Sequence, residues 1–213
     1  YHELNIVSPT SIIENIKLHN PDILVNAAAY TAVEKAESEI KLAFAVNREG
    51  SQYLAEACVK FNIPLIHIST DYVFDGNKGE SYTENDQPNP INVYGRSKLE
   101  GENAISSILQ EHIILRTSWV FGIHGNNFVK IIRQLGKKQD TLRVISDLYG
   151  CPTPAADIAG VIAKLLSFFY HGKKILWGTY HYCGTPTTSW YCFAQEIFKI
   201  ALKLKNQKIP FTS

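Results

Sequence analysis

Residues 64–69 read PLIHIS, and this run gives the clearest indication of the fold. A short, nearly apolar stretch that begins at a proline and ends in a polar loop is typical of a buried strand. Similar runs occur upstream at residues 22–26, DILVN, and downstream at residues 113–116, IILR. Strands that are apolar on both faces indicate a parallel sheet covered by helices.

Amphipathic stretches with apolar residues at three- and four-residue spacing separate these strands, and they predict helices. The alternation of strands and helices predicts a doubly wound parallel α/β sheet of the Rossmann type. In such sheets, ligands bind beyond the carboxyl ends of the strands. Helices are expected at residues 9–20, 39–61, 92–109, 127–137, 157–169 and 189–204, with further strands at 142–145 and 180–182.

Composition excludes several classes of function. The 213 residues include 21 basic and 20 acidic side chains, a net charge of +1, so we expect neither a nucleic-acid partner nor an anionic membrane partner. No apolar run approaches the roughly 18 residues of a spanning helix. The four cysteines lie far apart without metal-ligand spacing, which favours reduced thiols in a cytoplasmic protein rather than a disulfide framework or a metal site.

The clearest chemical signal is the pair Tyr94 and Lys98, which a spacing of four places on one face of a helix. Acid–base work near neutral pH is favoured by a phenol pKa about three units below its usual value of about 10, a shift of about 4 kcal/mol. A cation about 4 Å away supplies about that energy at an effective dielectric constant near 20. We therefore expect Lys98 to lower the pKa of Tyr94.

A second signal is Ser69-Thr70-Asp71, which follows the buried strand directly. There the Thr70 hydroxyl can hold a substrate oxygen while the Tyr94 phenol protonates it. The same three residue types are also common in ordinary turns, so this segment indicates a functional site only in combination with the Tyr-Lys pair.

Several longer blocks, in order along the chain, resemble the dTDP-4-dehydrorhamnose reductase family. The Tyr-x-x-x-Lys pair alone indicates only the wider short-chain dehydrogenase/reductase group. The Arg-Thr-Ser-Trp and Gly-Asn-Asn-Phe blocks narrow the resemblance to the rhamnose reductases and their close relatives. Together the blocks cover the chain from about residue 20 to residue 155. They are NAAAYTAV (26–33), KAESE (35–39), STDYVFDG (69–76), NVYGRSKLEGE (92–102), RTSWV (116–120), GNNF (125–128) and DLYGCPT (147–153).

The resemblance implies an oxidoreductase that transfers hydride from NADPH or NADH to the C4 ketone of dTDP-4-dehydro-L-rhamnose. The product, dTDP-L-rhamnose, is a precursor of cell-surface polysaccharides. Tyr94 would donate the proton, and Lys98 would hold the nicotinamide ribose. Thr70 would bind the substrate near C4, with Asp71 contacting the sugar.

The resemblance also implies further binding residues and partners. Ala29, Tyr30, Thr31 and Ile68 would line the cofactor beside Tyr94 and Lys98. Trp119 and Asn127 would contact the sugar nucleotide. Some relatives carry a divalent ion at a dimer contact, so the resemblance leaves a homodimer and a bound Mg²⁺ open.

The chain departs from the family at its beginning. It starts at Tyr1, contains no Met and has no Gly before Gly50, although a dinucleotide pyrophosphate needs a Gly-rich turn at a helix N-terminus. We therefore expect that the N-terminal Gly-rich unit, which also selects NADH or NADPH, is absent from this chain. On this view residues 1–145 form an incomplete cofactor-binding domain, and residues 146–213 form a substrate-binding portion that is incomplete at the C-terminus.

Two other functions stay open. A non-catalytic regulator similar to the methionine adenosyltransferase β subunit would share the fold, but it would have no chemical reason to keep Thr70, Tyr94, Lys98 and Trp119 together. An epimerase or dehydratase acting on another sugar nucleotide is a nearer rival. A dehydratase is expected to place an acidic pair after the threonine, and here Asp71 is followed by Tyr72.

Overall fold

The computed structural model describes residues 3–204, which form two compact units. The first unit runs from residue 3 to Thr117 and includes Gly172–His181, and the second consists of Ser118–His171 and residues 182–204. This division differs from the expected boundary after residue 145. The chain leaves the first unit after Thr117, at the end of a strand, and residues 172–181 return to it with a later strand.

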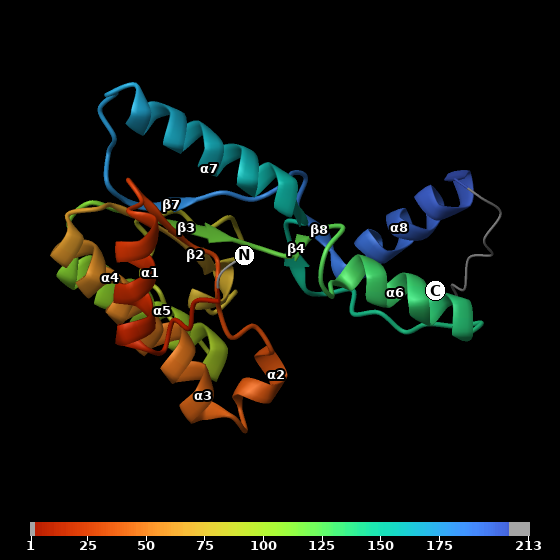
Figure 1. Cartoon of the computed structure of the whole chain (residues 1–213). Helices are drawn as coiled ribbons and strands as arrows, with labels where there is room; N and C mark the ends of the chain where they lie inside the picture. Colours follow the sequence, from red (N-terminus) through yellow and green to blue (C-terminus); the bar gives the residue numbers. More distant parts are fainter. Residues whose placement is uncertain (1–2, 205–213) are drawn as a thin grey trace. The chain divides into compact units, whose positions relative to one another are not determined.

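The first unit is built on a parallel sheet, as the sequence predicted. Its four strands are β1 (Leu24–Asn26), β2 (Leu65–Thr70), β3 (His112–Thr117) and β7 (Gly178–His181), in the order β1-β2-β3-β7 (Figure 1). Asn26 is in register with His67, and Thr70 with Thr117. The carboxyl ends of these strands therefore lie along one edge of the sheet, where ligands of such folds bind.

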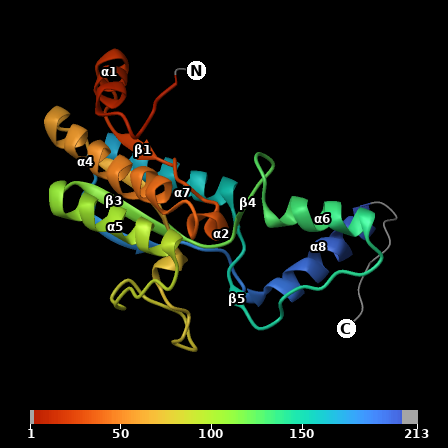
Figure 2. The same ribbon diagram turned by 90° about the horizontal axis from the view of Figure 1, so that it is seen from below.

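Two helices of the first unit, α4 and α5, pack against this sheet. Each step from β1 to β2 to β3 runs in the same direction, so right-handed crossovers place the connecting helices on one face. Figure 2 shows α4 and α5 side by side along the strands. Ile12, Leu54, Leu65, Ile105 and Ile114 belong to the core beneath them. The elements are α1 (Pro9–His19), α2 (Val33–Ala36), α3 (Ile40–Phe44), the π-helical turn η1 (Ala45–Glu49), α4 (Gly50–Phe61), the 3₁₀ turn η2 (Asp71–Val73) and α5 (Val93–Ile108).

Local hydrogen bonds explain where the key helices begin. Ser8 caps α1 by accepting a bond from the Ser11 amide at 3.3 Å. Asn92 caps α5 by accepting from the Gly95 amide at 2.7 Å. These caps satisfy amide groups that a helix leaves without an intrahelical partner.

The helix expected over residues 39–61 contains a π-helical turn, η1, between α3 and α4. At this turn the backbone of Asn47 lies against Gly101 of α5, so closely that a Cβ atom at Gly101 would overlap the Asn47 carbonyl oxygen. Glycine at position 101 therefore allows α5 to approach the turn. Sequence periodicity did not predict the π turn, because three-to-four spacing is hardly altered by one extra residue in a turn.

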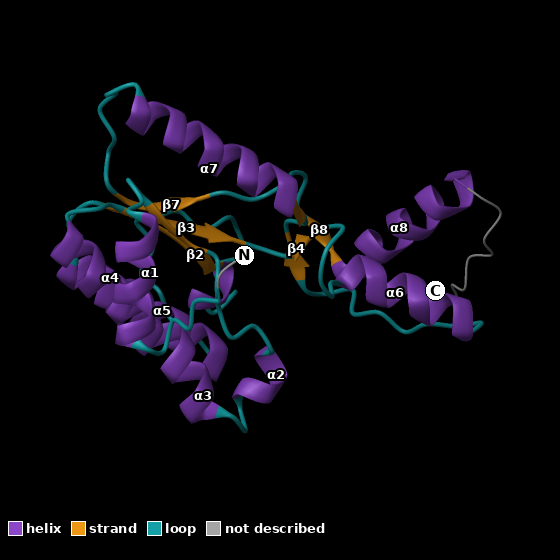
Figure 3. Ribbon diagram, viewed as in Figure 1, coloured by secondary structure: helices purple, strands orange, loops and turns teal. Residues whose placement is uncertain are grey.

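The second unit is richer in helix, with only two-residue strands (Figure 3). Its core lies between α6 and α8 and includes Ile132, Leu142, Ala194, Ile197 and Phe198. Strand β4 pairs in parallel with β6, and β5 pairs antiparallel with β8. The elements are β4 (Val120–Phe121), α6 (Phe128–Lys138), β5 (Tyr149–Gly150), β6 (Thr153–Pro154), α7 (Ala155–Tyr170), β8 (Thr188–Ser189) and α8 (Trp190–Leu204).

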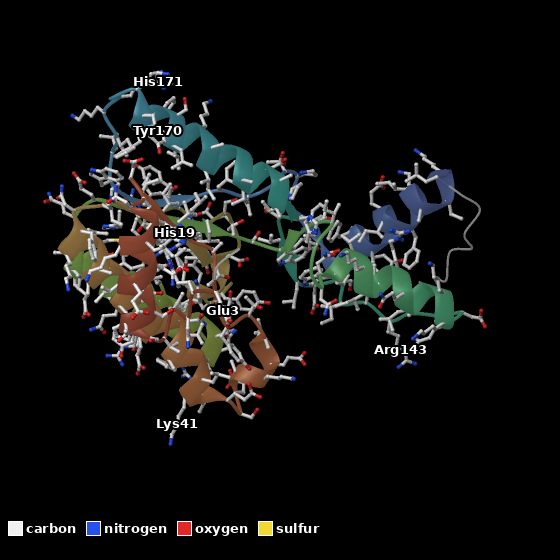
Figure 4. All side chains as sticks on the ribbon, in the orientation of Figure 1. Glu3, His19, Lys41, Arg143, Tyr170 and His171 are labelled. Carbon is white, nitrogen blue, oxygen red and sulfur yellow. The ribbon has the colours of Figure 1, made fainter. Side chains whose placement is uncertain are left out.

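The prediction of a strand at residues 142–145 is wrong. Leu142 and Val144 do turn toward the apolar cluster, while Arg143 points away from α6 and α8 (Figure 4). The alternation in the sequence is thus real, but residues 142–145 form no strand. Burial against helices produces the same alternating pattern that strand pairing would require.

The close approach of α5 to η1 predicts the effect of a single methyl group. Gly101→Ala should lower the free energy of unfolding by about 1–3 kcal/mol, the usual range for an overpacked contact. Gly160→Ala in α7 is the matched control, because its Cβ would meet no atom within 4 Å. There the higher helix propensity of alanine should raise stability by about 0.5–1 kcal/mol. Urea unfolding followed by circular dichroism measures both values, and two changes of the same sign would contradict the packing argument.

Candidate active site

Lys98 is the most deeply buried charged side chain at the carboxyl edge of the sheet, with 1% of its surface exposed. Its Nζ donates a hydrogen bond of 2.7 Å to the Ile68 carbonyl oxygen of β2 and lies 3.2 Å from His67 Nε2. Burial lowers the pKa of Lys98 to about 8, although the Glu102 carboxylate raises it. The expected cofactor residues Ile68 and Lys98 are thus in direct contact.

His67 connects Lys98 to the neighbouring strand. Its Nδ1 lies 2.9 Å from the Asn26 side-chain nitrogen, and the Asn26 Oδ1 accepts a bond of 3.1 Å from the Ala28 amide. Burial, and then the charge of Lys98, lower the pKa of His67 well below its usual value. A polar chain therefore runs from β1 through β2 to α5.

Tyr94 lies one turn before Lys98 on α5 and is 9% exposed. Its ring packs edge-to-face against Tyr72, with 5.5 Å between the ring centroids. Burial raises the pKa of Tyr94 to about 12, while a hydrogen bond between the Tyr94 and Thr70 side chains opposes the rise. The expectation that Lys98 lowers this pKa is therefore wrong for this structure, because burial dominates and the Lys98 amine is directed to β2.

Thr70 ends β2 and begins η2. Its hydroxyl accepts a bond of 3.2 Å from the Tyr72 amide and donates one of 3.1 Å to the Asp71 carboxylate. Burial raises the pKa of Asp71 to about 6. The structure thus brings Thr70, Asp71 and Tyr94 together, as the sequence predicted, while their roles in binding and proton transfer stay predictions.

The expected cofactor loop, Ala29-Tyr30-Thr31, follows β1 and is held by Asn47 of the π turn. The Asn47 side chain accepts from the Tyr30 amide at 2.9 Å and donates to the Tyr30 carbonyl oxygen at 3.1 Å. It also donates to Ser97 Oγ at 2.9 Å, and Ser97 lies on α5 between Tyr94 and Lys98. Sequence reasoning missed Asn47, although a polar residue on the buried face of an apolar helix was a usable signal.

A buried ion pair fixes α5 against β3, and it was also missed. Arg116 Nη2 donates to Glu102 Oε2 at 2.7 Å, with side-chain exposures of 8% and 3%. Ser69 Oγ donates to the other carboxylate oxygen of Glu102. The Arg116 guanidinium also lies over the Phe74 ring, which anchors the loop after η2. One helix thereby contacts two strands through charged side chains.

Trp119 and Asn127, the expected substrate contacts, belong to the second unit. Trp119 adopts a positive φ of 45° and stacks on Trp190, with 3.5 Å between centroids. Asn127 caps α6, accepting from the Lys130 amide at 3.2 Å and donating to the Gly122 carbonyl oxygen at 2.8 Å. Both residues make contacts that stabilise their own unit, and their contact with a substrate stays a prediction.

One hydroxyl group at the carboxyl edge has no hydrogen-bond partner. Thr117 Oγ1, in register with Thr70, is the one buried side-chain oxygen or nitrogen without a partner in the described range 3–204. Within that range no group of three His, Cys, Asp or Glu side chains could hold a metal ion, so nothing supports the Mg²⁺ that the resemblance left open. None of the described helices has the length and apolar character needed to cross a membrane.

A buried tyrosine that contacts a threonine, with a lysine one turn further along the same helix, is the arrangement found in short-chain dehydrogenases/reductases. The parallel sheet beneath it is the one on which that class is built. Fold and site together therefore place the chain in this class.

Comparison with known proteins identifies the family to which the chain belongs within this class. The family model described as RmlD substrate binding domain matches residues 1–213. A dTDP-4-dehydrorhamnose reductase of Aggregatibacter actinomycetemcomitans is 44% identical over 96% of this chain and 70% of its own length. One from Sinorhizobium fredii is 46% identical over 94% of this chain and 68% of its own length.

A solved structure agrees with these relatives. The dTDP-4-dehydrorhamnose reductase of Bacillus anthracis, crystallised in complex with NADP, superposes with a TM-score of 0.88 at 39% identity, covering 93% of this chain and 69% of that one. This chain belongs to the dTDP-4-dehydrorhamnose reductase family. It spans about 70% of the length of these relatives.

The buried, uncharged state of His67 predicts a pH dependence of stability. Because the folded-state pKa lies below the unfolded value of about 6.5, its contribution is complete above that pH and is lost as the pH falls. In the wild type this one group should remove up to about 1.4 kcal/mol per pH unit below the unfolded pKa. In His67→Gln this part of the slope should vanish.

Urea unfolding at several mildly acidic pH values measures the difference between the two proteins. Asp71 acts in the opposite direction, because its raised pKa adds stability that is lost as the pH rises through about 6. This contribution is common to both proteins and cancels in the comparison. Equal slopes in the two proteins would show that His67 is charged in the folded state or exposed to solvent.

Proposed function

We propose that this chain carries the reductase chemistry of its family: reduction of the C4 ketone of dTDP-4-dehydro-L-rhamnose to dTDP-L-rhamnose by NADPH or NADH. The observation that carries the proposal is the contact between Tyr94 and Thr70 at the carboxyl edge of a parallel sheet. The relatives named above as reductases, one of them in complex with NADP, support it. A bound nicotinamide would supply the hydride.

Tyr94 would provide the proton. With a pKa near 12, its phenol is fully protonated at neutral pH and can act as an acid. Hydride addition leaves an alkoxide on the sugar, and an alkoxide is a stronger base than a phenolate. The proton therefore moves to the sugar without any lowering of the phenol pKa beforehand. The Thr70 hydroxyl would hold the same oxygen in place.

Lys98 would hold the ribose of the cofactor. Ile68 O takes one of its N–H groups, and at least one more is free to bind a hydroxyl. The loop of Ala29, Tyr30 and Thr31, fixed by Asn47, would border the cofactor. The unpartnered Thr117 hydroxyl at the same edge offers a further polar contact.

The second unit would bind the sugar nucleotide, with Trp119 and Asn127 as its candidate contacts. A cytoplasmic location and a homodimer stay predictions. The choice between NADH and NADPH also stays open. A regulatory role or an epimerase activity is less well supported, because the relatives that share 44% and 46% of residues are reductases.

Removal of one hydroxyl group tests the role of Tyr94. Tyr94→Phe should lower turnover at least 100-fold, since general acid catalysis contributes about 10²–10⁴-fold, while cofactor affinity stays nearly unchanged. Oxidation of NADPH in the presence of dTDP-4-dehydro-L-rhamnose measures turnover, and calorimetry measures cofactor affinity.

Tyr53→Phe is the matched control, because Tyr53 packs against the core beneath α4 and lies outside the site. It should keep turnover close to that of the wild type. A Tyr94→Phe enzyme that retained more than a tenth of wild-type turnover would remove Tyr94 from the acid role.

Replacement of the buried amine tests Lys98. Lys98→Met keeps a long side chain but removes the donor to a ribose, so the KM for NADPH should rise at least tenfold, the equivalent of about 1.4 kcal/mol for a lost charged hydrogen bond. The acidic limb of the pH–rate profile should also move. An unchanged KM together with an unchanged profile would count against this role.

A further inference from the structure

We propose that Trp190 is a positioning residue for Trp119: its indole holds the Trp119 ring against Gly150, so that Trp119 meets a sugar nucleotide in one fixed orientation. This inference rests on the proposed function only in treating Trp119 as a contact of the sugar nucleotide. The three residues come from separate segments of the second unit, namely the turn between β3 and β4, strand β5 and the start of α8.

The backbone of Trp119 is strained. Its φ of 45° lies in the left-handed region, which a bulky side chain rarely adopts. In the described range 3–204, the other non-glycine residues with a positive φ are Asn20 and Asn62, and each follows a helix, where asparagine is common. Trp119 lies just after a strand and has no such reason for its conformation. Strain of this kind persists only where the surroundings hold the residue, and it is concentrated at functional sites.

The Trp119 ring is held by contacts with two other segments. Trp190 stacks on it, with 3.5 Å between the ring centroids and 12° between the ring planes. A Cβ atom at Gly150 would overlap the Cε2, Cζ2 and Nε1 atoms of the Trp119 indole. Gly150 is not among the described glycines with a positive φ, so the close contact, rather than the backbone conformation, requires glycine there. Gly150 and Trp190 together therefore restrict the ring to one position.

Hydrogen bonds between backbone groups fix Gly150 and Trp190 relative to each other. Gly150 of β5 is in register with Thr188 of β8, two residues before Trp190. The Trp190 amide donates to the Leu148 carbonyl oxygen at 3.4 Å, two residues before Gly150. The two residues that hold the Trp119 ring thus belong to one paired segment of backbone, which is able to keep a strained neighbour in place.

This arrangement prepares Trp119 for a ligand before the ligand arrives. The ring is only half-buried even with Trp190 stacked on it, so part of its apolar surface stays available to a sugar or a base. Without Trp190 the Trp119 side chain would be free to rotate, and ordering it on binding would lower affinity. A preformed contact acts equally in the bound substrate and in the transition state, so its loss should raise KM and leave kcat nearly unchanged.

A double-mutant cycle tests whether Trp190 acts through Trp119. Trp190→Leu removes the stacked ring, and the KM for dTDP-4-dehydro-L-rhamnose should rise about five- to tenfold, as expected for ordering one side chain on binding. Trp119→Leu should raise KM at least as much. The double variant should have the KM of Trp119→Leu alone, because the second ring then has nothing left to position. An unchanged KM in Trp190→Leu, or increases that multiply in the double variant, would overturn the proposal.

Circular dichroism observes the stack without any ligand. Two stacked indoles couple and give a pair of bands of opposite sign, which Trp119→Leu and Trp190→Leu should each abolish. Trp177, the third tryptophan of the chain, lies in the first unit, so Trp177→Leu is the matched control and should keep both the paired bands and the wild-type KM. A wild type that lacks the paired bands would contradict the proposal.

Two further variants keep the proposal testable if Trp190→Leu does not fold. Trp190→Phe keeps an aromatic face and should have a KM close to that of the wild type. Gly150→Ala should displace the Trp119 ring, so the paired bands should weaken and KM should rise; an unchanged KM despite the loss of the bands would overturn the proposal.

Calorimetric titration with dTDP-L-rhamnose repeats the cycle without turnover and separates this inference from the proposed function. A protein that shows the non-additive loss of affinity but does not reduce the ketone would refute the proposed function and leave this inference standing. A protein that reduces the ketone but loses affinity additively in the double variant would do the opposite.

Discussion

The burial of the Lys98 side chain is the constraint around which the first unit is organised. An amine with 1% exposure is tolerated in a protein interior only where hydrogen bonds replace water. Ile68 O and His67 are those partners, and both lie on β2. The helix α5 can therefore take only one position on the sheet, and that position places Tyr94 beside Thr70 at the carboxyl edge.

Two further polar networks hold the same helix. Glu102 and Arg116 connect α5 to β3, and Asn47 connects it through Ser97 to the loop after β1. A buried polar network destabilises the fold when some of its hydrogen-bonding groups lack partners. A complete network specifies one arrangement of its elements, because only that arrangement gives every group a partner. These networks explain how a site built from three separate segments keeps its geometry without depending on apolar packing alone.

Much of this arrangement follows from the sequence, and the exceptions have a common cause. Residues 64–69 predicted β2 because a parallel strand is apolar on both faces, and a spacing of four placed Tyr94 and Lys98 on one helix face. The direction of the Lys98 amine was not predictable, since it depends on His67 and a carbonyl group of another element. The π turn at Asn47 likewise lies against Gly101, which is far along the chain, and local periodicity does not reveal that contact.

The return of β7 to the sheet has a consequence for synthesis on the ribosome. β3 ends at Thr117, but its neighbour on the far side begins at Gly178, after most of the second unit has been made. Until then the open side of β3 presents unpaired backbone groups, which are prone to pair with other chains. The nascent protein is thus exposed to misassembly for the time needed to translate residues 118–177, and chaperone binding during that interval would protect the strand that carries Arg116.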